Sequence, residues 1–171
     1  YTDEAYYYLW SRHLSMGYLD HPAMIAYAIK AATVFGDTAQ TIRTVNIVSF
    51  FGAAAFVYLS AEYLLKDKKA AVYSFFIFIL SPAATMGLSI TTPDSPLVLF
   101  WSAALYFGAR AFFEDKTSLY AVTGALIGLA MLSKYTAVLI AASLVILITI
   151  KKPKLYLTKK PYIAIVAALI A

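Results

Sequence analysis

The 171-residue chain is too apolar for an ordinary soluble domain, because 62% of its residues are hydrophobic and only 13% are charged. Soluble domains carry about 25% charged and about 45–50% apolar residues, so the composition indicates an integral membrane protein. The net charge of +5 lies in lysine-rich loops, without a basic face of interleaved aromatics, which argues against nucleic acid as a partner. The absence of cysteine excludes disulfides and thiolate metal sites.

The first part of the chain combines acidic, aromatic and basic side chains. We predict an extracytoplasmic loop over 1–41 that carries two short helices at the membrane surface, at 5–16 and roughly 22–35. The first is too short to span the ~30 Å hydrocarbon layer. The tyrosines and Trp10 are interpreted as residues of the aromatic belt. Pro22 suits the first turn of the second helix.

From residue 42 onward, apolar runs alternate with short loops, which predicts transmembrane helices over 42–171. The expected helices lie at about 42–65, 70–88, 96–113, 119–133, 135–150 and 161–171. Ser81-Pro82 predicts a kink in the second helix. One helix over 119–150 would overshoot the bilayer by about 18 Å, so we divide that run at Lys134. The predicted fold is all-α, a multi-pass transmembrane bundle with an external loop that carries two interfacial helices.

The charged loops predict the orientation of this bundle. Alternating crossings place ten of the 14 Lys and Arg residues on one side and four on the other. The positive-inside rule assigns the richer side to the cytoplasm. The lysine-rich loop at 151–160 is interpreted as part of this topology signal and as a contact for lipid headgroups. Six polar residues then share the extracytoplasmic face of a cell-membrane protein: Asp3, Glu4, Asp20, His21, Asp94 and Lys134.

The acidic pairs near the start admit two interpretations each. Asp3 and Glu4 lie at an apolar surface, where a carboxylate can be tuned to take a proton from a hydroxyl. Alternatively, Asp3 caps a helix that begins near Ala5, and Glu4 sits in its first turn. Asp20 and His21 can bind a divalent ion or a phosphate, although zinc takes three or four ligands. Their alternative is an N-cap beside a surface histidine.

Asp94 and Lys134 are equally open to two interpretations. Asp94 fits the N-cap of a helix with Pro96 in its first turn, yet it falls on the same face as the other acids. Lys134 lies between two apolar segments, where an ammonium at mid-membrane costs about 2.5–3.5 kcal/mol. We expect it either to pair with a phosphate at the lipid–water boundary or to extend to water from an ordinary tight loop.

Four motifs resemble the C-type glycosyltransferases that use lipid-phosphate sugars, a group that includes protein O-mannosyltransferases and lipid A aminoarabinose transferases. Residues 3–7 (DEAYY) are similar to their first external loop, and residues 18–24 (YLDHPAM) to the second part of that loop. Residues 92–97 (TPDSPL) resemble the acidic motif at the start of a later helix. Residues 132–136 (LSKYT) resemble a lysine-containing turn between two short helices. The order of the motifs makes the match specific.

The resemblance implies a membrane enzyme that transfers a sugar from a polyprenyl-phosphate donor, with inversion, to a protein, lipid or glycan acceptor. Its catalytic residues would be Asp3, the base that deprotonates the acceptor, and Glu4, which assists. The substrate-binding residues would be Asp20, His21, Asp94 and Lys134. The cofactor stays open, and Asp20 with His21 would be the candidate ligands if a divalent ion takes part. Membrane lipids are the other expected partners.

The sequence departs from this family in several respects. It lacks the helix that precedes the acidic pair, the later helices and the C-terminal soluble domain, and Ala23 replaces the second proline of a Pro-Pro pair. It also starts without Met and stops within an apolar run, so we expect a part of a longer protein. One alternative function is a transporter or flippase of a phosphorylated lipid, with Lys134 on the phosphate and the acids as a proton relay. A second is a non-catalytic membrane subunit, in which each acid caps a helix.

Overall fold

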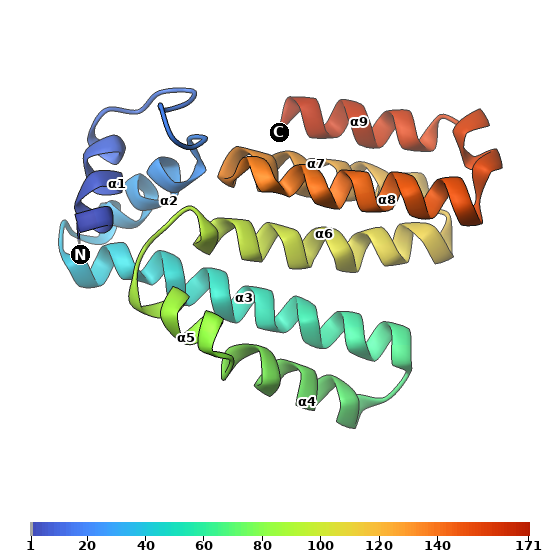
Figure 1. The fold of residues 1–171 in the computed structure, drawn as a ribbon, viewed down its shortest axis with the longest axis horizontal. Coiled ribbons are helices and arrows are strands. Elements are labelled where there is room, and N and C mark those ends of the chain that lie inside the picture. Colours follow the sequence, from blue (N-terminus) through green and yellow to red (C-terminus); the bar gives the residue numbers. More distant parts are fainter. Residues whose placement is uncertain (1) are drawn as a thin grey trace.

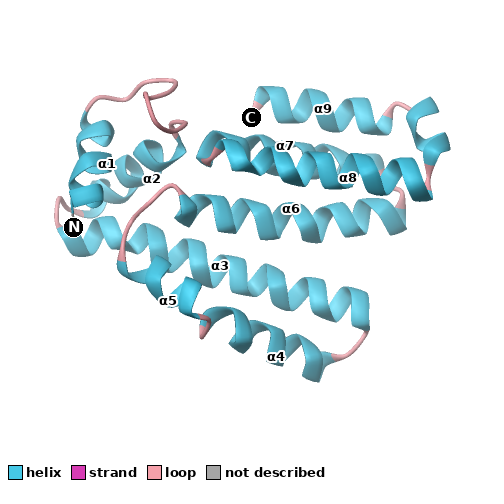
Figure 2. Cartoon of the chain, in the orientation of Figure 1, coloured by secondary structure: helices cyan, strands magenta, loops and turns pink. Residues whose placement is uncertain are grey.

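Helices form most of the chain in the computed structural model, which describes residues 2–171 (Figure 1, Figure 2). The helices are α1 (Thr2–Arg12), α2 (Met24–Ala32), η1 (Thr33–Phe35), α3 (Ala39–Leu65), α4 (Lys68–Ile79), α5 (Pro82–Ser89), α6 (Asp94–Glu114), α7 (Thr117–Ser133), η2 (Tyr135–Ala137), α8 (Val138–Lys151), η3 (Pro153–Leu157) and α9 (Lys160–Ile170). These residues contain no strand, apart from an isolated bridge between Gly17 and Pro22. The predicted all-α fold is confirmed.

Two helices are long and apolar enough to cross a membrane, α3 with 27 residues and α6 with 21. α4 and α5 meet the same criteria only when taken together, and they bend by 53° at the break between them. The kink predicted at Ser81-Pro82 lies there: Ser81 accepts a hydrogen bond from the Ala84 N–H, and Pro82 begins α5. The apolar helices α7 to α9 are shorter. The fold is that of a helical membrane protein with two such spans, or three if the bent pair counts as one.

The helices define two ends of the bundle (Figure 1). α6 packs on both α3 and α7, and α7 packs on α9. α1 and α2, the start of α6 and the junction of α7 with η2 lie at one end, here called the α1–α2 end (Figure 1). The loops that follow α3, α6 and α8 lie at the opposite end, here called the basic end (Figure 1). The ten-to-four division of Lys and Arg therefore corresponds to the two ends of the structure.

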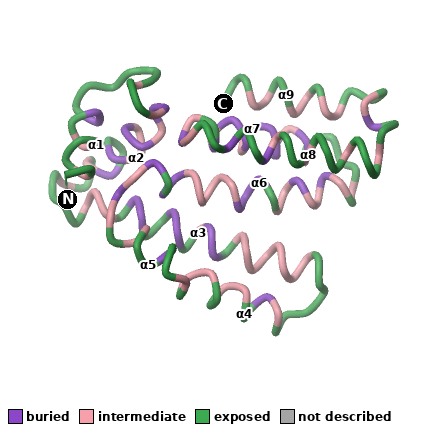
Figure 3. Tube along the Cα trace, in the orientation of Figure 1, coloured by how far each residue is buried: buried purple, intermediate pink, exposed green. Residues whose placement is uncertain are grey.

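α1 and α2 pack over the start of α3 around a small core, and Figure 3 shows buried stretches in all three helices. Tyr7 and Trp10 are each only 8% exposed. Trp10 also stacks on Tyr18, with ring centroids 4.1 Å apart and planes 5° from parallel. The interpretation of Tyr7 and Trp10 as belt residues is therefore wrong, because their rings are buried between helices that pack on one another.

α1 begins at Thr2 and ends at Arg12, earlier than the predicted helix at both ends. A side chain from the following loop forms hydrogen bonds with backbone groups at the C-terminus of α1. The Tyr18 hydroxyl lies 2.9 Å from the carbonyl oxygen of Trp10 and 2.8 Å from that of His13. It also accepts a hydrogen bond from the Ser15 N–H at 3.2 Å. In a longer helix these backbone groups would form hydrogen bonds within the helix. Because they bond to the Tyr18 hydroxyl instead, the helix ends there.

α7 and α9 approach each other closely because small residues face one another between them. A Cβ atom on Gly124 would lie 2.0 Å from the carbonyl oxygen of Ala164, and one on Gly128 would lie 2.4 Å from that of Ala168. Membrane helices use such small residues, four positions apart, to bring their backbones together. This contact sets the position of α9 beside α7.

Candidate functional site

The elements that carry the six predicted site residues all meet at the α1–α2 end (Figure 1). Asp3 and Glu4 lie in the first turn of α1, and Asp20 and His21 lie in the loop before α2. Asp94 is the first residue of α6. Lys134 joins α7 to η2 in an extended conformation, with φ −158° and ψ 138°. The side chains on these elements form two linked groups, one around Lys134 and one around Glu4.

Asp94 and Lys134 form an ion pair between α6 and the α7–η2 junction. The Lys134 Nζ lies 2.7 Å from Asp94 Oδ1. The Lys134 side chain is 29% exposed and that of Asp94 is 55% exposed. The N-cap residue of α6 is Pro93, and no side chain caps this helix. The interpretation of Asp94 as an N-cap is therefore wrong, since its carboxylate binds a lysine from another helix junction.

Glu4 anchors α1 to two other parts of the chain. Its two carboxylate oxygens accept hydrogen bonds from Arg43 of α3, from Nε at 2.9 Å and from Nη2 at 2.8 Å. The backbone N–H of Thr91, in the loop before α6, donates to Glu4 Oε1 at 3.2 Å. The Glu4 side chain is only 12% exposed. The hydrogen bonds from Arg43 lower the pKa of Glu4 although burial opposes them, which makes this carboxylate a weak base.

Asp3 is exposed and differs from Glu4 in its surroundings. Within residues 2–171 its carboxylate has no hydrogen-bond or ion-pair partner, so its oxygens are open to a ligand. α1 begins at Thr2, so Asp3 belongs to the helix itself. The alternative in which Asp3 caps a helix starting near Ala5 is therefore wrong. A carboxylate in a first turn is still favoured by the helix dipole.

Tyr7 of α1 is subject to the charges of three acidic residues. Its pKa is raised, first by burial and then by the negative charges of Asp3, Asp94 and Asp20. Its ring centroid lies 6.2 Å from that of His21. Tyr7 is not among the six site residues predicted from the sequence. Its position four residues after Asp3 on one helix was the available signal, because such residues share a helix face.

Asp20 binds a side chain of α1 rather than capping α2. Asp20 Oδ2 accepts a hydrogen bond of 2.7 Å from the Tyr6 hydroxyl. The N-cap of α2 is Ala23, and it makes no side-chain hydrogen bond, so the predicted cap at Asp20 or His21 is wrong. Residues 2–171 contain no group of three or more His, Cys, Asp or Glu side chains that could hold a metal ion. Asp20 and His21 alone fall short of the usual ligand number.

An apolar groove of about 620 Å³ lies beside the Asp94–Lys134 pair. Its walls come from α3, α5 and α6, and from the loop that joins α5 to α6. The residues that line it are Phe50, Ala83, Met86, Gly87, Ile90, Thr92, Asp94, Leu97, Val98 and Trp101. Asp94 is the charged member of this lining. The groove therefore offers hydrocarbon-like walls that lead to an ion pair.

A buried polar pair supports the start of α6. The Ser95 hydroxyl donates to Asn46 Oδ1 at 2.9 Å, and both residues are fully buried. This bond joins α3 to α6 one residue after Asp94. Because buried polar groups are costly when unpaired, the bond favours one position of α6 relative to α3.

Comparison with known proteins identifies the family. The model of the dolichyl-phosphate-mannose-protein mannosyltransferase family matches residues 20–171. The chain belongs to this family. The resemblance to the C-type glycosyltransferases is confirmed.

One relative of this mannosyltransferase-family chain is the lipid A galacturonosyltransferase RgtD of Rhizobium johnstonii, which is 28% identical over 144 residues. The match covers 82% of the chain and 30% of the relative, so the chain spans less than a third of the relative's length. No solved structure matches the chain.

The mannosyltransferase-family match begins at residue 20, so it includes four of the six predicted site residues and leaves out Asp3 and Glu4. The structure links those two to the matched part through the contacts of Glu4 with Arg43 and Thr91. Arg43 is a further contributor to the site that is not among the residues predicted from the sequence. A lone arginine near the start of an otherwise apolar helix was the signal for it.

Proposed function

We propose that the protein is part of a membrane glycosyltransferase that moves a sugar from a polyprenyl-phosphate donor to an acceptor hydroxyl or lipid phosphate. The observation that carries this proposal is the Asp94–Lys134 pair at the edge of an apolar groove. An ammonium beside such a groove suits a lipid phosphate, because the cation meets the headgroup while the walls hold the hydrocarbon. Membership of a family of sugar transferases supports the same reaction class.

In the proposed reaction, Asp3 takes the proton of the acceptor hydroxyl while the hydroxyl oxygen attacks the anomeric carbon. The new carbon–oxygen bond forms opposite the phosphate, the bond to the polyprenyl phosphate breaks, and the configuration inverts. Lys134, together with His21, stabilises the negative charge on the departing phosphate. Asp20 orients the sugar or the acceptor, and Asp94 holds Lys134 in position. The open carboxylate of Asp3 suits the base role.

We infer a positioning role for Glu4. Both of its oxygens are bound by Arg43, and its pKa is lowered, so it is poorly suited to take part in proton transfer. Its bonds to α3 and to the loop before α6 instead fix the face of α1 that carries Asp3.

We further propose that the α1–α2 end faces the extracytoplasmic side and that the chain crosses the membrane several times. The support is the distribution of charge: ten Lys and Arg residues belong to the basic end and four to the α1–α2 end. The positive-inside rule then places the basic end in the cytoplasm.

The test uses the full-length protein in membranes supplied with a radiolabelled polyprenyl-phosphate sugar. Wild type is compared with Asp3→Asn, which keeps the size of the side chain. Asp37→Asn is the matched control, because Asp37 is also an exposed carboxylate of the α1–α2 end. We expect labelled product to fall at least a hundredfold in Asp3→Asn and to persist in Asp37→Asn, at equal expression and melting temperature.

The other outcomes separate the rival functions. If Asp3→Asn transfers sugar as well as wild type, Asp3 is not the base. A non-catalytic subunit predicts that neutralising Asp3, Asp20 or Asp94 lowers stability while transfer by its complex continues. A flippase predicts movement of the lipid without a new glycosidic bond. A proton relay also needs ionisable groups along the membrane-spanning helices, and α3 has no charged residue between Arg43 and Glu62.

A further inference from the structure

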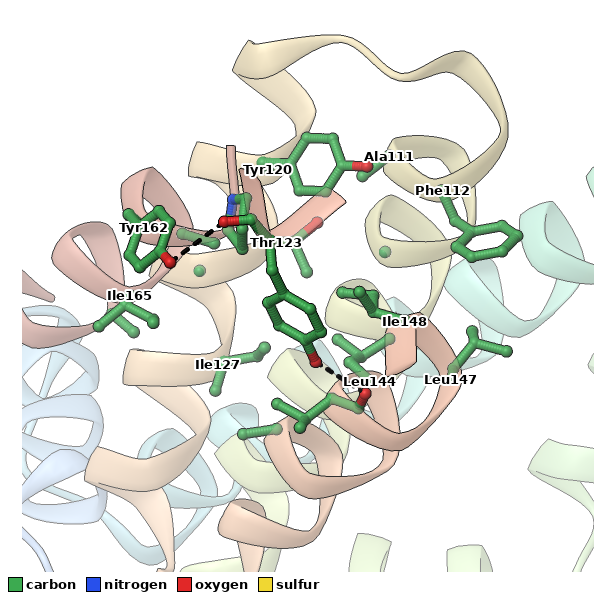
Figure 4. A pocket seen from close by; sticks show the side chains of 18 residues that line it. Ala111, Phe112, Tyr120, Thr123, Ile127, Leu144, Leu147, Ile148, Tyr162 and Ile165 are labelled. Atoms are coloured by element: carbon green, nitrogen blue, oxygen red, sulfur yellow. Dashed lines mark hydrogen bonds between the residues drawn. The ribbon is translucent and has the colours of Figure 1, made fainter. Parts of the chain in front are cut away.

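A second apolar cavity lies toward the basic end, away from the candidate site. Figure 4 shows the side chains that line it. It has a volume of about 280 Å³ and lies among α6, α7, α8, η3 and α9. On α7 its wall runs from Tyr120 to Ile127, which is about 10 Å along a helix. Val145 of α8 and Ile165 of α9 both line it and are 53% and 56% exposed, so the cavity opens sideways between these helices.

The hydroxyl groups around this cavity are already bound to the protein. The Tyr162 hydroxyl donates to the carbonyl oxygen of Tyr156 at 3.1 Å, and the Tyr156 hydroxyl bonds to that of Val145 at 3.1 Å (Figure 4). The Thr123 hydroxyl donates to the Leu119 carbonyl oxygen at 2.7 Å. The remaining wall is hydrocarbon, which favours an apolar occupant over water.

The basic end of the bundle is rich in lysine, and its loop at residues 151–160 contains no acidic residue. Residues 151–160 contain Lys151, Lys152, Lys154, Lys159 and Lys160, and no Asp or Glu follows Asp115 in the sequence. Lys160 pairs with Asp115 at 2.5 Å. Three exposed lysines, Lys151, Lys154 and Lys159, have no carboxylate partner within residues 2–171. This end therefore carries uncompensated positive charge.

The cavity and the lysines are directly connected. The Lys152 Nζ donates to the carbonyl oxygen of Phe112 and lies 4.3 Å from the centroid of the Phe112 ring, which lines the cavity. Lys160 directly precedes Pro161 and Tyr162, which line it as well. Cationic groups thus stand at the end of a hydrocarbon-lined space that opens between α8 and α9.

We propose that this arrangement is a binding site for an anionic phospholipid. One acyl chain occupies the cavity through the opening between α8 and α9, and the phosphate lies among the lysines of residues 151–160. Charge complementarity selects this occupant, because lysines near a membrane surface attract anionic lipids and basic pockets between helices bind their headgroups. A zwitterionic lipid would fill the cavity equally well but would gain less from the lysines.

The experiment measures lipid binding to the full-length protein, reconstituted in phosphatidylcholine nanodiscs that contain increasing amounts of phosphatidylglycerol. Bound lipid is identified by mass spectrometry. We expect wild type to retain phosphatidylglycerol in preference to phosphatidylcholine, and glycerol phosphate in solution not to displace it. The variant Lys151→Gln/Lys154→Gln/Lys159→Gln should weaken this binding about a hundredfold, since each lysine contributes about fivefold. The matched control neutralises Lys66, Lys68 and Lys69, exposed lysines of the basic end at the α3–α4 turn.

A second pair of variants tests the cavity. Val145→Trp places a bulky side chain at the sideways opening and should weaken retention of phosphatidylglycerol. Val48→Trp is its control, because Val48 is 66% exposed on α3 and lies outside the cavity lining. Equal retention of both lipids by wild type would overturn the proposal. Equal losses of binding from the two triple-lysine variants would also overturn it, because the attraction of anionic lipid would then be spread over the whole basic end. Unchanged binding by Val145→Trp would overturn it as well, because the acyl chain would then not occupy the cavity. Displacement by glycerol phosphate would show a free-phosphate site instead.

Discussion

Asp94 and Lys134 are 40 residues apart in the sequence, yet Lys134 Nζ lies 2.7 Å from Asp94 Oδ1. The pair joins the start of α6 to the end of α7 and provides a partner for an ammonium that would otherwise be costly near the membrane. In the proposed reaction, the lipid phosphate replaces Asp94 as the partner of the lysine. In the proposed reaction, Asp94 thus keeps Lys134 in place between turnovers.

Lys134→Met should lower kcat/KM for the lipid-phosphate donor by about 10²–10³-fold, as expected when a group that stabilises developing charge is removed. Asp94→Asn should have a smaller effect, because Lys134 remains. The double variant should resemble Lys134→Met alone, since the residues act as a pair. Steady-state transfer kinetics check this prediction, with Lys30→Met as a control at an exposed lysine of α2. Independent, additive losses would contradict the pairing.

Glu4→Gln should destabilise the packing of α1 against α3. Its partner Arg43 would keep weaker hydrogen bonds and lose the opposite charge, which costs about 1–2 kcal/mol for a partly exposed, charge-assisted pair. The apparent melting temperature in detergent should fall in Glu4→Gln and in Arg43→Gln alike. Asp3→Asn should melt as wild type does, because Asp3 has no partner within residues 2–171. If Glu4→Gln melted as wild type does but lost sugar transfer, Glu4 would have a direct catalytic role instead.

The same contact predicts a dependence of stability on pH. The pKa of Glu4 is lower in the folded protein than its ordinary value of 4.5, because Arg43 binds the ionised form. Its contribution to stability is therefore complete above about pH 5 and is lost as the pH falls through the lowered pKa. The difference in melting temperature between wild type and Glu4→Gln should be constant from pH 6 to 8 and should shrink toward zero below pH 4. A difference that grows on acidification would contradict this assignment.

Gly124→Ala should disrupt the contact of α7 with α9. The new methyl group would lie 2.0 Å from the carbonyl oxygen of Ala164, so α9 must shift, at a cost of about 1–3 kcal/mol. Gly108→Ala is the matched control on α6, because its nearest neighbour, the Thr123 methyl group, would be 3.4 Å away. Alanine there should be neutral or stabilising by about 0.5–1 kcal/mol through helix propensity. Thermal unfolding of both variants measures the effect.

The helices and the breaks between them were predictable from the sequence, because each depends on residues that are contiguous in the chain. Apolar runs indicated the helices observed as α3 and α6, and a serine followed by proline indicated the break between α4 and α5. The interruption at Lys134 was predictable for the same reason, since one helix over 119–150 would overshoot the bilayer by about 18 Å. The capping interpretations of Asp20 and Asp94 were wrong, because short-range patterns cannot show that a side chain has a better partner elsewhere. That of Asp3 was wrong because α1 begins earlier than the local pattern indicated.

By itself, the sequence determined that this is a helical membrane protein with acidic residues, a histidine and a lysine in the order of the C-type glycosyltransferases. The tertiary structure decided which of these residues meet. Helix packing brings Glu4 to Arg43 and Asp94 to Lys134, buries Tyr7 between packed helices, and leaves Asp3 open to a ligand. The physical reason is that hydrophobicity and proline geometry act within a segment, whereas an ion pair across 39 or 40 residues exists only once the helices are packed.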